Sequence, residues 1–327
     1  MQIKRQRAPY IFHQESTRTV MLDMILALLV VYAICFYYYG RRAVALGLIC
    51  AVTALLCDWV CTLLMRRRIP LNDLSPLVTG LIIPLLMPAS IAFHIPVLAV
   101  LFGLIVAKAA FGGTGHNVFN PAAAGLAFAI SCFPAQIFSY PVPGRALSSP
   151  LPMFPGLDNA TIPSPAFYLN VGGIPAYDIE EMLLGNFPGP MGATNILVIL
   201  ACLLYLVFRR ALKWEIPVFF LLTALMLAFW FPRAPVFGAY SVVYEMMSGM
   251  LLFGGVFMLG DPVTSPRRGP GKIAYAITAA AAVMFFRHFG RFEESFVFVL
   301  LAVNAAVWGF DMLGEAIASK IRRRKKE

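Results

Sequence analysis

Three polar stretches rich in glycine and proline interrupt an otherwise apolar chain, and they hold most of the residues able to do chemistry. They are SPLVTGLIIPLLMP at 75–88, FGGTGHNVFNPAAAG at 111–125 and GDPVTSP at 260–266. Hydroxyl, amide, imidazole and carboxylate groups in apolar surroundings are costly to bury unless they are paired. They therefore need one another, water, an ion or a cofactor. The candidate site residues are Thr79, Gly80, His116, Asn117, Asn120, Asp261, Thr264 and Ser265.

Taken singly, each stretch is also explained as a broken helix whose ends are capped by its own polar residues. Three such stretches in one chain favour a binding site over three unrelated caps, because polar groups at membrane depth usually serve function. The sequence alone leaves both interpretations open.

Three acidic residues, Asp23, Asp58 and Asp311, lie within or near apolar segments. Carboxylates at such positions are candidates for an ion path. Each has an alternative role, at a helix end or paired with a neighbouring arginine. Cys57 and Cys61 stand four residues apart, but without a second pair they are packing residues, and we expect no metal site.

The composition indicates that most of the chain is surrounded by lipid and not by water. Of 327 residues, 60% are apolar and 13% charged, and the mean hydropathy is +0.78. A globular core of this length could not hide so much apolar surface. The net charge of +10 lies in short runs of Lys and Arg between apolar stretches, which is typical of membrane topology. We therefore expect an integral membrane protein in contact with lipid, with no nucleic-acid partner.

The apolar stretches predict an all-α fold of about ten transmembrane segments, since a spanning helix takes roughly 20 apolar residues. Two segments are short or broken by proline, 74–90 and 117–133. We expect these two to be half-helices or re-entrant pieces whose backbone groups are satisfied by protein or a wet cavity. The others are 19–39, 43–65, 92–111, 194–208, 214–231, 242–260, 273–287 and 294–313.

The basic residues predict the orientation, because Lys and Arg concentrate in cytoplasmic loops. With the N-terminus inside, all but six of the 26 Lys and Arg residues fall on the cytoplasmic side. Both termini are therefore predicted to be cytoplasmic. The first apolar run is too long for a cleaved signal peptide. The six exceptions are Arg41, Arg42, Arg145, Arg233, Arg287 and Arg291.

One long connection, 134–193, divides the predicted segments into two groups of about five. It contains 11 prolines and little charge, which predicts an irregular, structured extracytoplasmic loop. An odd number of segments in each half would invert the second half in the membrane, and inverted repeats commonly place a site between them. The predicted units are a cytoplasmic N-terminal segment (1–18), a first membrane half (19–133), the loop (134–193), a second membrane half (194–313) and a basic cytoplasmic tail (314–327).

The string GHNVFNPAAAG, with SPLVTGL upstream and DPVTSP downstream, resembles a known family. It is similar to the D subunit of the Rnf ion-translocating ferredoxin:NAD oxidoreductase complex and to the B subunit of the sodium-pumping NADH:quinone reductase. The similarity covers essentially the whole membrane chain, and its length fits the Rnf subunit better.

The resemblance implies a covalent flavin. Members of that family carry FMN joined through its phosphate to a threonine, in a Gly-Ala-Thr motif just before a membrane helix. Gly192, Ala193 and Thr194 stand at that position here, followed by Asn195. A helix start suits a phosphate because it presents free N–H groups and a positive dipole. Without the resemblance, Thr194 is an ordinary helix N-cap.

The function implied is that of a flavin-carrying membrane subunit, not catalytic alone. Its complex would couple ferredoxin:NAD oxidoreduction to Na⁺ or H⁺ translocation, with other membrane and peripheral subunits as partners and a bacterial or archaeal cell membrane as location. A second, noncovalent flavin such as riboflavin is compatible with the resemblance. The alternatives are a passive, urea-channel-like channel or carrier for a small polar solute, and a scaffold for other redox subunits.

Overall fold

The regular elements in the described part of the chain are all helices. The computed structural model describes residues 17–66, 73–144, 162–235, 238–290 and 293–324, and every helix or strand assigned within them is a helix. The predicted all-α fold is therefore confirmed for these residues. The sequence-based expectations for residues 1–16, Arg145, Arg291 and the centre of the long connection lie outside the described residues.

The helices form two groups in chain order. The first group is α1 (Thr17–Tyr39), α2 (Arg41–Leu64), α3 (Ser75–Leu85), α4 (His94–Phe102), the π-helix η1 (Gly103–Ala109) and α5 (Pro121–Cys132). Three short helices follow, α6 (Pro134–Ile137), α7 (Pro165–Asn170) and α8 (Ile179–Leu184). The second group is α9 (Ile196–Phe208), α10 (Glu215–Trp230), α11 (Ala239–Met247), α12 (Leu251–Phe257), α13 (Gly269–Phe289), α14 (Phe296–Ala305) and α15 (Val307–Arg324).

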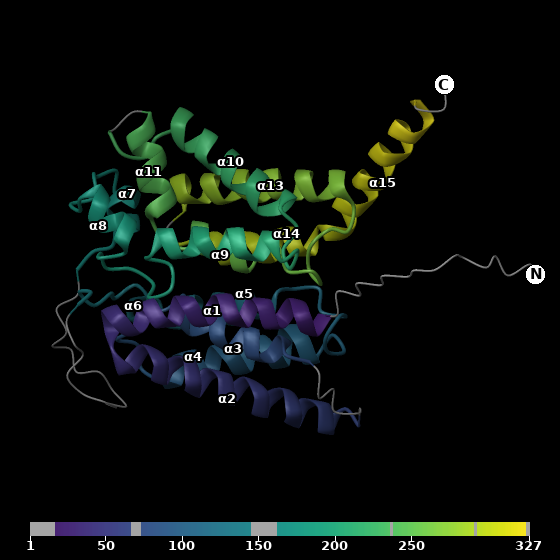
Figure 1. Cartoon of the computed structure of the whole chain (residues 1–327), viewed down its shortest axis with the longest axis horizontal. Helices are drawn as coiled ribbons and strands as arrows, with labels where there is room; N and C mark the ends of the chain where they lie inside the picture. The colour runs from purple at the N-terminus through teal and green to yellow at the C-terminus, as the bar shows by residue number, and fades with distance from the viewer. Residues whose placement is uncertain (1–16, 67–72, 145–161, 236–237, 291–292, 325–327) are drawn as a thin grey trace, which may run out of the picture.

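The two groups lie side by side as layers of one bundle (Figure 1). Helix α1 packs against α9 and α5 packs against α14, so these pairs join the groups. The short helices α6–α8 lie at one end, which we call the loop end. The start of α1 and the whole of α15 lie at the other, which we call the terminal end.

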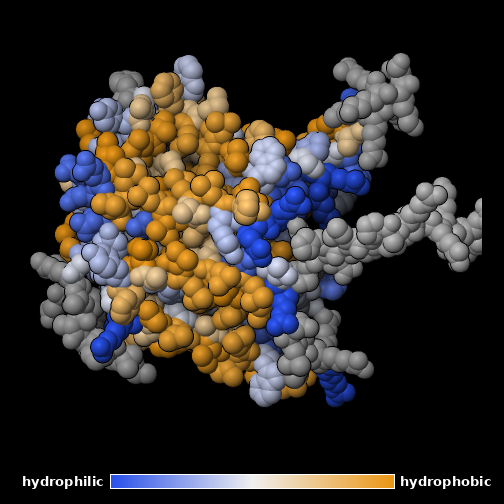
Figure 2. Space-filling model, in the orientation of Figure 1, coloured by the Kyte–Doolittle hydropathy of each residue, from blue (hydrophilic) through white to orange (hydrophobic). Residues whose placement is uncertain are grey.

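The outer surface is apolar across the middle of the bundle. Figure 2 shows a broad hydrophobic band between hydrophilic ends on the face in view. The exposed side chains of the outer surface include Leu26, Leu48, Leu204 and Phe285. A soluble protein rarely exposes such an area, whereas lipid accommodates it. The structure is thus consistent with an integral membrane protein.

Helix lengths vary more than the sequence suggested. By length and hydropathy α1, α2 and α13 can cross a bilayer alone, and the bent pairs α11–α12 (63°) and α14–α15 (59°) can do so as pairs. The remaining apolar helices have 10–17 residues: α3, α4 with η1, α5, α9 and α10. The two predicted segments 242–260 and 294–313 are each bent and comprise a pair of helices.

The break after α3 is held by an arginine. Pro84 lies inside α3, which ends at Leu85, and the chain from 86 to 93 is irregular. The buried side chain of Arg42, from α2, donates to the carbonyl oxygens of Ala89 (2.7 Å), Ser90 (3.1 Å) and Ile91 (2.8 Å). Carbonyls that helix bonding would otherwise satisfy are thus paired inside the protein, as a bilayer requires.

Replacing Arg42 by Met should destabilise the fold while leaving the apolar stem in place. Three carbonyls would lose their donors, and each buried unpaired group costs about 1–3 kcal/mol. We expect the free energy of unfolding in detergent to fall by roughly 2–5 kcal/mol. Arg41 is exposed, so Arg41→Met is the matched control and should change it little. Equal effects of the two substitutions would contradict the proposed clamp.

Candidate functional site

All three polar stretches reach one cavity between the two helix groups. This cavity, of about 60 Å³, is lined by Ser75 and Thr79, by Asn117 and Asn120, and by Asp261. Residues more than 100 positions apart in sequence are therefore brought together at one place. A volume of this size holds a few water molecules or an ion and is too small for a flavin ring.

Asn120 both caps a helix and bridges the groups. Its Oδ1 accepts from the backbone N–H groups of Ala122 (2.9 Å) and Ala123 (3.2 Å), which makes it the N-cap of α5. Its Nδ2 donates to the carbonyl oxygen of Met258 (3.2 Å) in the second group. The capping interpretation of this residue is thus confirmed, and its amide also joins the two helix groups.

The other residues of the polar stretches divide between roles. Gly80 allows α3 to approach α2, since a Cβ there would lie 2.8 Å from the Cβ of Ala54. His116 is exposed and lines a neighbouring cleft of about 390 Å³. Thr264 donates to Asp261 Oδ2 (2.9 Å). Thr264 and Ser265 also line a third hollow with Asp311, at the terminal end.

A buried lysine joins the cavity to the cleft. Lys108, in η1, lines both, and its Nζ lies 2.8 Å from Asp58 Oδ1 and 3.2 Å from Asp73 Oδ2. The sequence analysis counted Lys108 only as a topological charge and did not single out Asp73. The available signal was a single cation inside an apolar run, which must find an anion if it is buried.

The three ion-path candidates all have partners. Asp23, on α1, accepts hydrogen bonds from Tyr205 of α9 (3.0 Å) and from Arg209, the residue directly after α9 (3.2 Å). Asp58 pairs with Lys108, and Asp311 accepts from the backbone N–H of Arg267 (2.8 Å). Pairing with an arginine, the alternative considered for these acids, therefore describes Asp23, whereas Asp58 pairs with a lysine.

Thr194 lies in a closed segment, residues 187–194, which we call the threonine segment; all eight residues are buried. Its backbone bonds to the end of α3, with Gly192 N–H donating to Leu85 O (2.7 Å) and Met191 N–H to Met87 O (3.1 Å). A Cβ on Gly192 would lie 2.6 Å from that of Leu85. This glycine therefore serves close packing on α3.

The interpretation of Thr194 as a helix N-cap is wrong. Asn195 caps α9, with its Oδ1 accepting from Val198 N–H (3.0 Å). Thr194 precedes the cap and is 1% exposed. The start of α9 fits an anionic group through its dipole and unbonded N–H groups. Because Thr194 is enclosed in this conformation, attachment of a flavin would require the threonine segment to separate from α3 or to be modified before it packs.

Comparison with known proteins matches this architecture to one family. The model of the NQR2, RnfD, RnfE family matches residues 4–317. The chain belongs to this family. The D subunit of the Na⁺-translocating ferredoxin:NAD⁺ oxidoreductase complex of Acetobacterium woodii is 30% identical over 91% of this chain and 89% of the relative. The D subunit of the ion-translocating oxidoreductase complex of Stutzerimonas stutzeri is 30% identical (90% and 89%), and that of Halorhodospira halophila 29% (89% and 88%).

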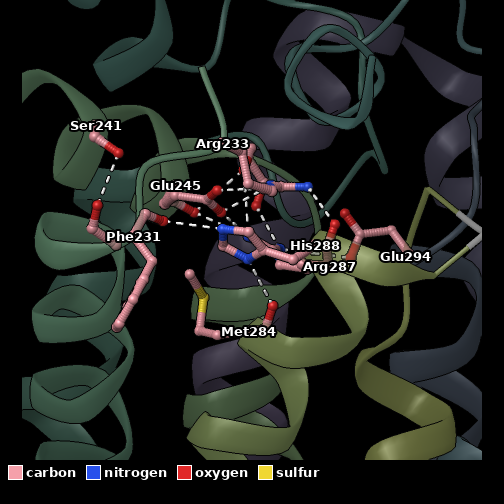
Figure 3. Close-up of polar contacts among 10 residues, drawn as sticks. Phe231, Arg233, Ser241, Glu245, Met284, Arg287, His288 and Glu294 are labelled. Atoms are coloured by element: carbon pink, nitrogen blue, oxygen red, sulfur yellow. Dashed lines mark hydrogen bonds and ion pairs between the residues drawn. The ribbon is translucent and has the colours of Figure 1, made fainter. Parts of the chain in front are cut away.

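This NQR2, RnfD, RnfE family member also has a buried ionic network at the loop end, which sequence analysis missed. Figure 3 shows Arg233, Glu245, Arg287 and Glu294 converging from the chain after α10, from α11, from α13 and from the chain before α14. Glu245 Oε2 lies 2.8 Å from both Arg233 Nη2 and Arg287 Nη1. Arg287 Nη2 lies 3.6 Å from Glu294 Oε2. All four side chains are nearly inaccessible.

A glycine makes room for this network. Gly249 has φ +63°, and a Cβ on it would overlap the carboxylate of Glu294. Both its backbone conformation and the carboxylate beside it therefore exclude a side chain. Arg287 also donates to the carbonyl oxygens of Glu245 (3.2 Å) and Ser248 (3.0 Å). The bend between α11 and α12 is thus sealed by charged groups, and two of the six topological exceptions, Arg233 and Arg287, serve this purpose.

Replacing Glu245 by Gln should destabilise the protein strongly. The buried guanidinium groups of Arg233 and Arg287 would both lose the carboxylate with which they pair. Breaking a buried ion pair on one side costs about 3–5 kcal/mol. Denaturant titration in detergent measures the change. Glu315→Gln, which breaks the exposed pair with Arg268, is the control and should cost less than about 1 kcal/mol. A small effect of Glu245→Gln would mean that the network is not a closed seal.

Glu293, between α13 and α14, makes stability depend on pH. Burial and the neighbouring Glu294 raise the pKa of Glu293 to about 8, although Ser164 donates a hydrogen bond to it. The unfolded chain has a glutamate pKa of about 4.3. The folded protein therefore binds the proton more strongly, and stability is greatest below about pH 4.3 for this group and falls as pH rises to about 8.

The expected decrease in the free energy of unfolding between about pH 5 and pH 8 is roughly 1–5 kcal/mol. Glu293→Gln should flatten this slope. Glu181→Gln, at an exposed position of α8, should leave it as in the wild type. Unfolding measured in detergent across this range tests both, and an unchanged slope in Glu293→Gln would rule out Glu293 as its origin.

Proposed function

We propose that this chain is the D-type membrane subunit of an ion-translocating oxidoreductase complex, coupling electron transfer between ferredoxin and NAD to export of Na⁺ or H⁺. Three relatives matched along about nine-tenths of the chain carry names of such subunits. The observation that carries the proposal beyond the names is the convergence of three distant polar stretches on one cavity between the helix groups. The chain would act only with the other subunits of its complex.

The proposed topology has about ten membrane segments in two inverted halves, with both termini in the cytoplasm. Each predicted segment contains one helix or bent pair: α1, α2, α3, α4 with η1, and α5, then α9, α10, α11 with α12, α13, and α14 with α15. In support, the start of α1 and the end of α15 lie at the same end of the bundle. The terminal end is then cytoplasmic and the loop end extracytoplasmic.

The proposed cofactor is FMN, joined through its phosphate to Thr194. Such a flavin would supply one- and two-electron redox chemistry that the side chains lack. Thr194 would hold it by a phosphoester, at the positive end of the α9 dipole. A second, noncovalent flavin stays a prediction, for which the cleft of about 390 Å³ is in the size range of small-molecule sites.

A passive pore for a small polar solute fits the described residues less well. Such a pore needs a polar path through the bundle. At the loop end Arg233, Glu245, Arg287 and Glu294 fill the space at the bend of α11 and α12 with paired charges. The cavity between the groups is also small, at about 60 Å³. Charged groups that close one end favour gated ion movement over free diffusion.

Thr194→Ala should abolish covalent flavin. The chain is produced in a host that has the flavin-attaching enzyme and is run on a denaturing gel, where covalent flavin fluoresces. Intact mass should show an FMN-sized increment on the wild type and none on Thr194→Ala. Thr53→Ala is the control, since the Thr53 hydroxyl donates within its own helix, to Ile49 O (2.8 Å), and it should keep the flavin.

The same variants separate a carrier from a scaffold. In the assembled complex, Thr194→Ala should stop ferredoxin-dependent NAD reduction if the flavin carries the electrons. Normal reduction by that variant would support the scaffold interpretation. A wild-type chain without flavin from a competent host would contradict the electron-carrier proposal altogether.

A further inference from the structure

The Lys108 ammonium group occupies a cage of oxygen atoms. Its Nζ lies 2.8 Å from Asp58 Oδ1, 3.1 Å from Ser75 Oγ and 3.2 Å from Asp73 Oδ2. The side chain of Lys108 is 5% exposed. The oxygens come from α2, from the start of α3 and from the chain before it, so three separate parts of the fold converge on this one cation.

Among the residues that the structure describes, the cage sets two carboxylates against one lysine. Asp73 accepts hydrogen bonds from Thr114 Oγ1 and from Ser75 N–H (2.9 Å). Together with the Lys108 charge these bonds outweigh burial and hold the pKa of Asp73 below its usual value. With Asp58, two carboxylates face one ammonium group. A net negative charge in a mostly buried place attracts a second cation.

The cage is placed between water and the space between the helix groups. The cleft of about 390 Å³ at the terminal end is lined by Asp58, Asp73 and Lys108. Lys108 also lines the cavity of about 60 Å³ that contains Asp261. A small cation in the cleft thus meets the two carboxylates directly, and Lys108 shares the smaller cavity with the Asp261 carboxylate.

Lysine is the residue type that can be displaced from such a cage. Its ammonium is a compact charge on a flexible stem, whereas the planar guanidinium of arginine is held by several directed bonds. The loop-end network uses arginine and lines neither the cavity of about 60 Å³ nor the cleft of about 390 Å³. The Lys108 cage has lysine and borders both. Lys108 also sits in the π-helix η1, and such distortions often occur at functional sites.

We propose that Lys108 is the resident cation of a monovalent-cation site, and that Na⁺ arriving from the cleft replaces its ammonium group on the oxygens of Asp58, Asp73 and Ser75. Carboxylate and hydroxyl oxygens are the ligands that hard cations prefer. The displaced ammonium group turns to Asp261, the carboxylate in the cavity that Lys108 also lines, and the bound Na⁺ offsets the excess negative charge of the cage. This inference rests on the proposed ion-translocating function and gives it an intake site.

Lys108→Met tests the exchange, because it removes the competing cation and keeps the stem. Binding of ²²Na⁺ to the purified full chain in detergent is measured with choline chloride holding the ionic strength constant. The variant should bind Na⁺ about tenfold more tightly than the wild type or better, since the lysine no longer occupies the site. Its thermal unfolding midpoint should rise with Na⁺ and not with choline.

Two further variants identify the ligands. Lys108→Met combined with Asp58→Asn and Asp73→Asn should lose the gained affinity. Arg209→Met is the matched control, because it removes a cation from the buried carboxylate of Asp23 without an oxygen cage, and it should bind Na⁺ as the wild type does. Equal responses of Lys108→Met to Na⁺ and choline would overturn the proposal, as would an equal gain in Arg209→Met.

If Lys108→Met does not fold, Asp58→Asn tests the same proposal. It leaves one carboxylate for one ammonium group, so the weak Na⁺ binding of the wild type should fall further, and unchanged binding would overturn the proposal. The assay needs no electron transfer. A chain that binds Na⁺ but carries no flavin would support the cation site and contradict the proposal of an electron carrier. A chain that carries flavin but does not bind Na⁺ would support the electron carrier and contradict the cation site.

Discussion

The structure depends on one constraint: within a surface made for lipid, every polar group must find its partner inside the protein. The break after α3 shows how this is met. Arg42 donates to the carbonyls of residues 89–91, and the threonine segment donates to those of Leu85 and Met87. A helix can therefore stop within the bundle. Because Arg42 of the first helix group and the segment just before α9 satisfy the same break, the two helix groups are tied to one another where α3 ends.

Buried charged side chains are paired differently at the two ends of the bundle. At the loop end, Arg233 and Arg287 share Glu245, and Glu294 completes a set of two cations and two anions. At the terminal end one lysine faces two aspartates beside a cleft. The first arrangement is neutral and enclosed, and the second is unbalanced and borders open space. In the proposed orientation an ion would thus meet a receptive site on the cytoplasmic side and a closed one on the other.

Composition and the length of the apolar stretches predicted the helical membrane fold, because lipid selects apolar helices regardless of how they pack. They could not predict the bends at Ser248–Met250 and Ala306, which depend on neighbours such as Arg287 and on contacts from distant helices. The polar stretches were found from sequence since a polar group in an apolar run is conspicuous. Asp73 and Glu294 were missed because each lies in a loop, where acidic residues are ordinary, and their burial arises only from tertiary packing.

Thr194 shows what the folded chain implies about the order of events. The hydroxyl is enclosed by packing of Gly192 on Leu85 and by the hydrogen bonds of the threonine segment. An enzyme cannot transfer a group to an atom that it cannot reach. If the proposed phosphoester forms, the bonds to Leu85 and Met87 must be absent when it forms, because they hold the segment against α3. Attachment of flavin and docking of the threonine segment would then compete, and modification would have to precede the final packing of the two helix groups.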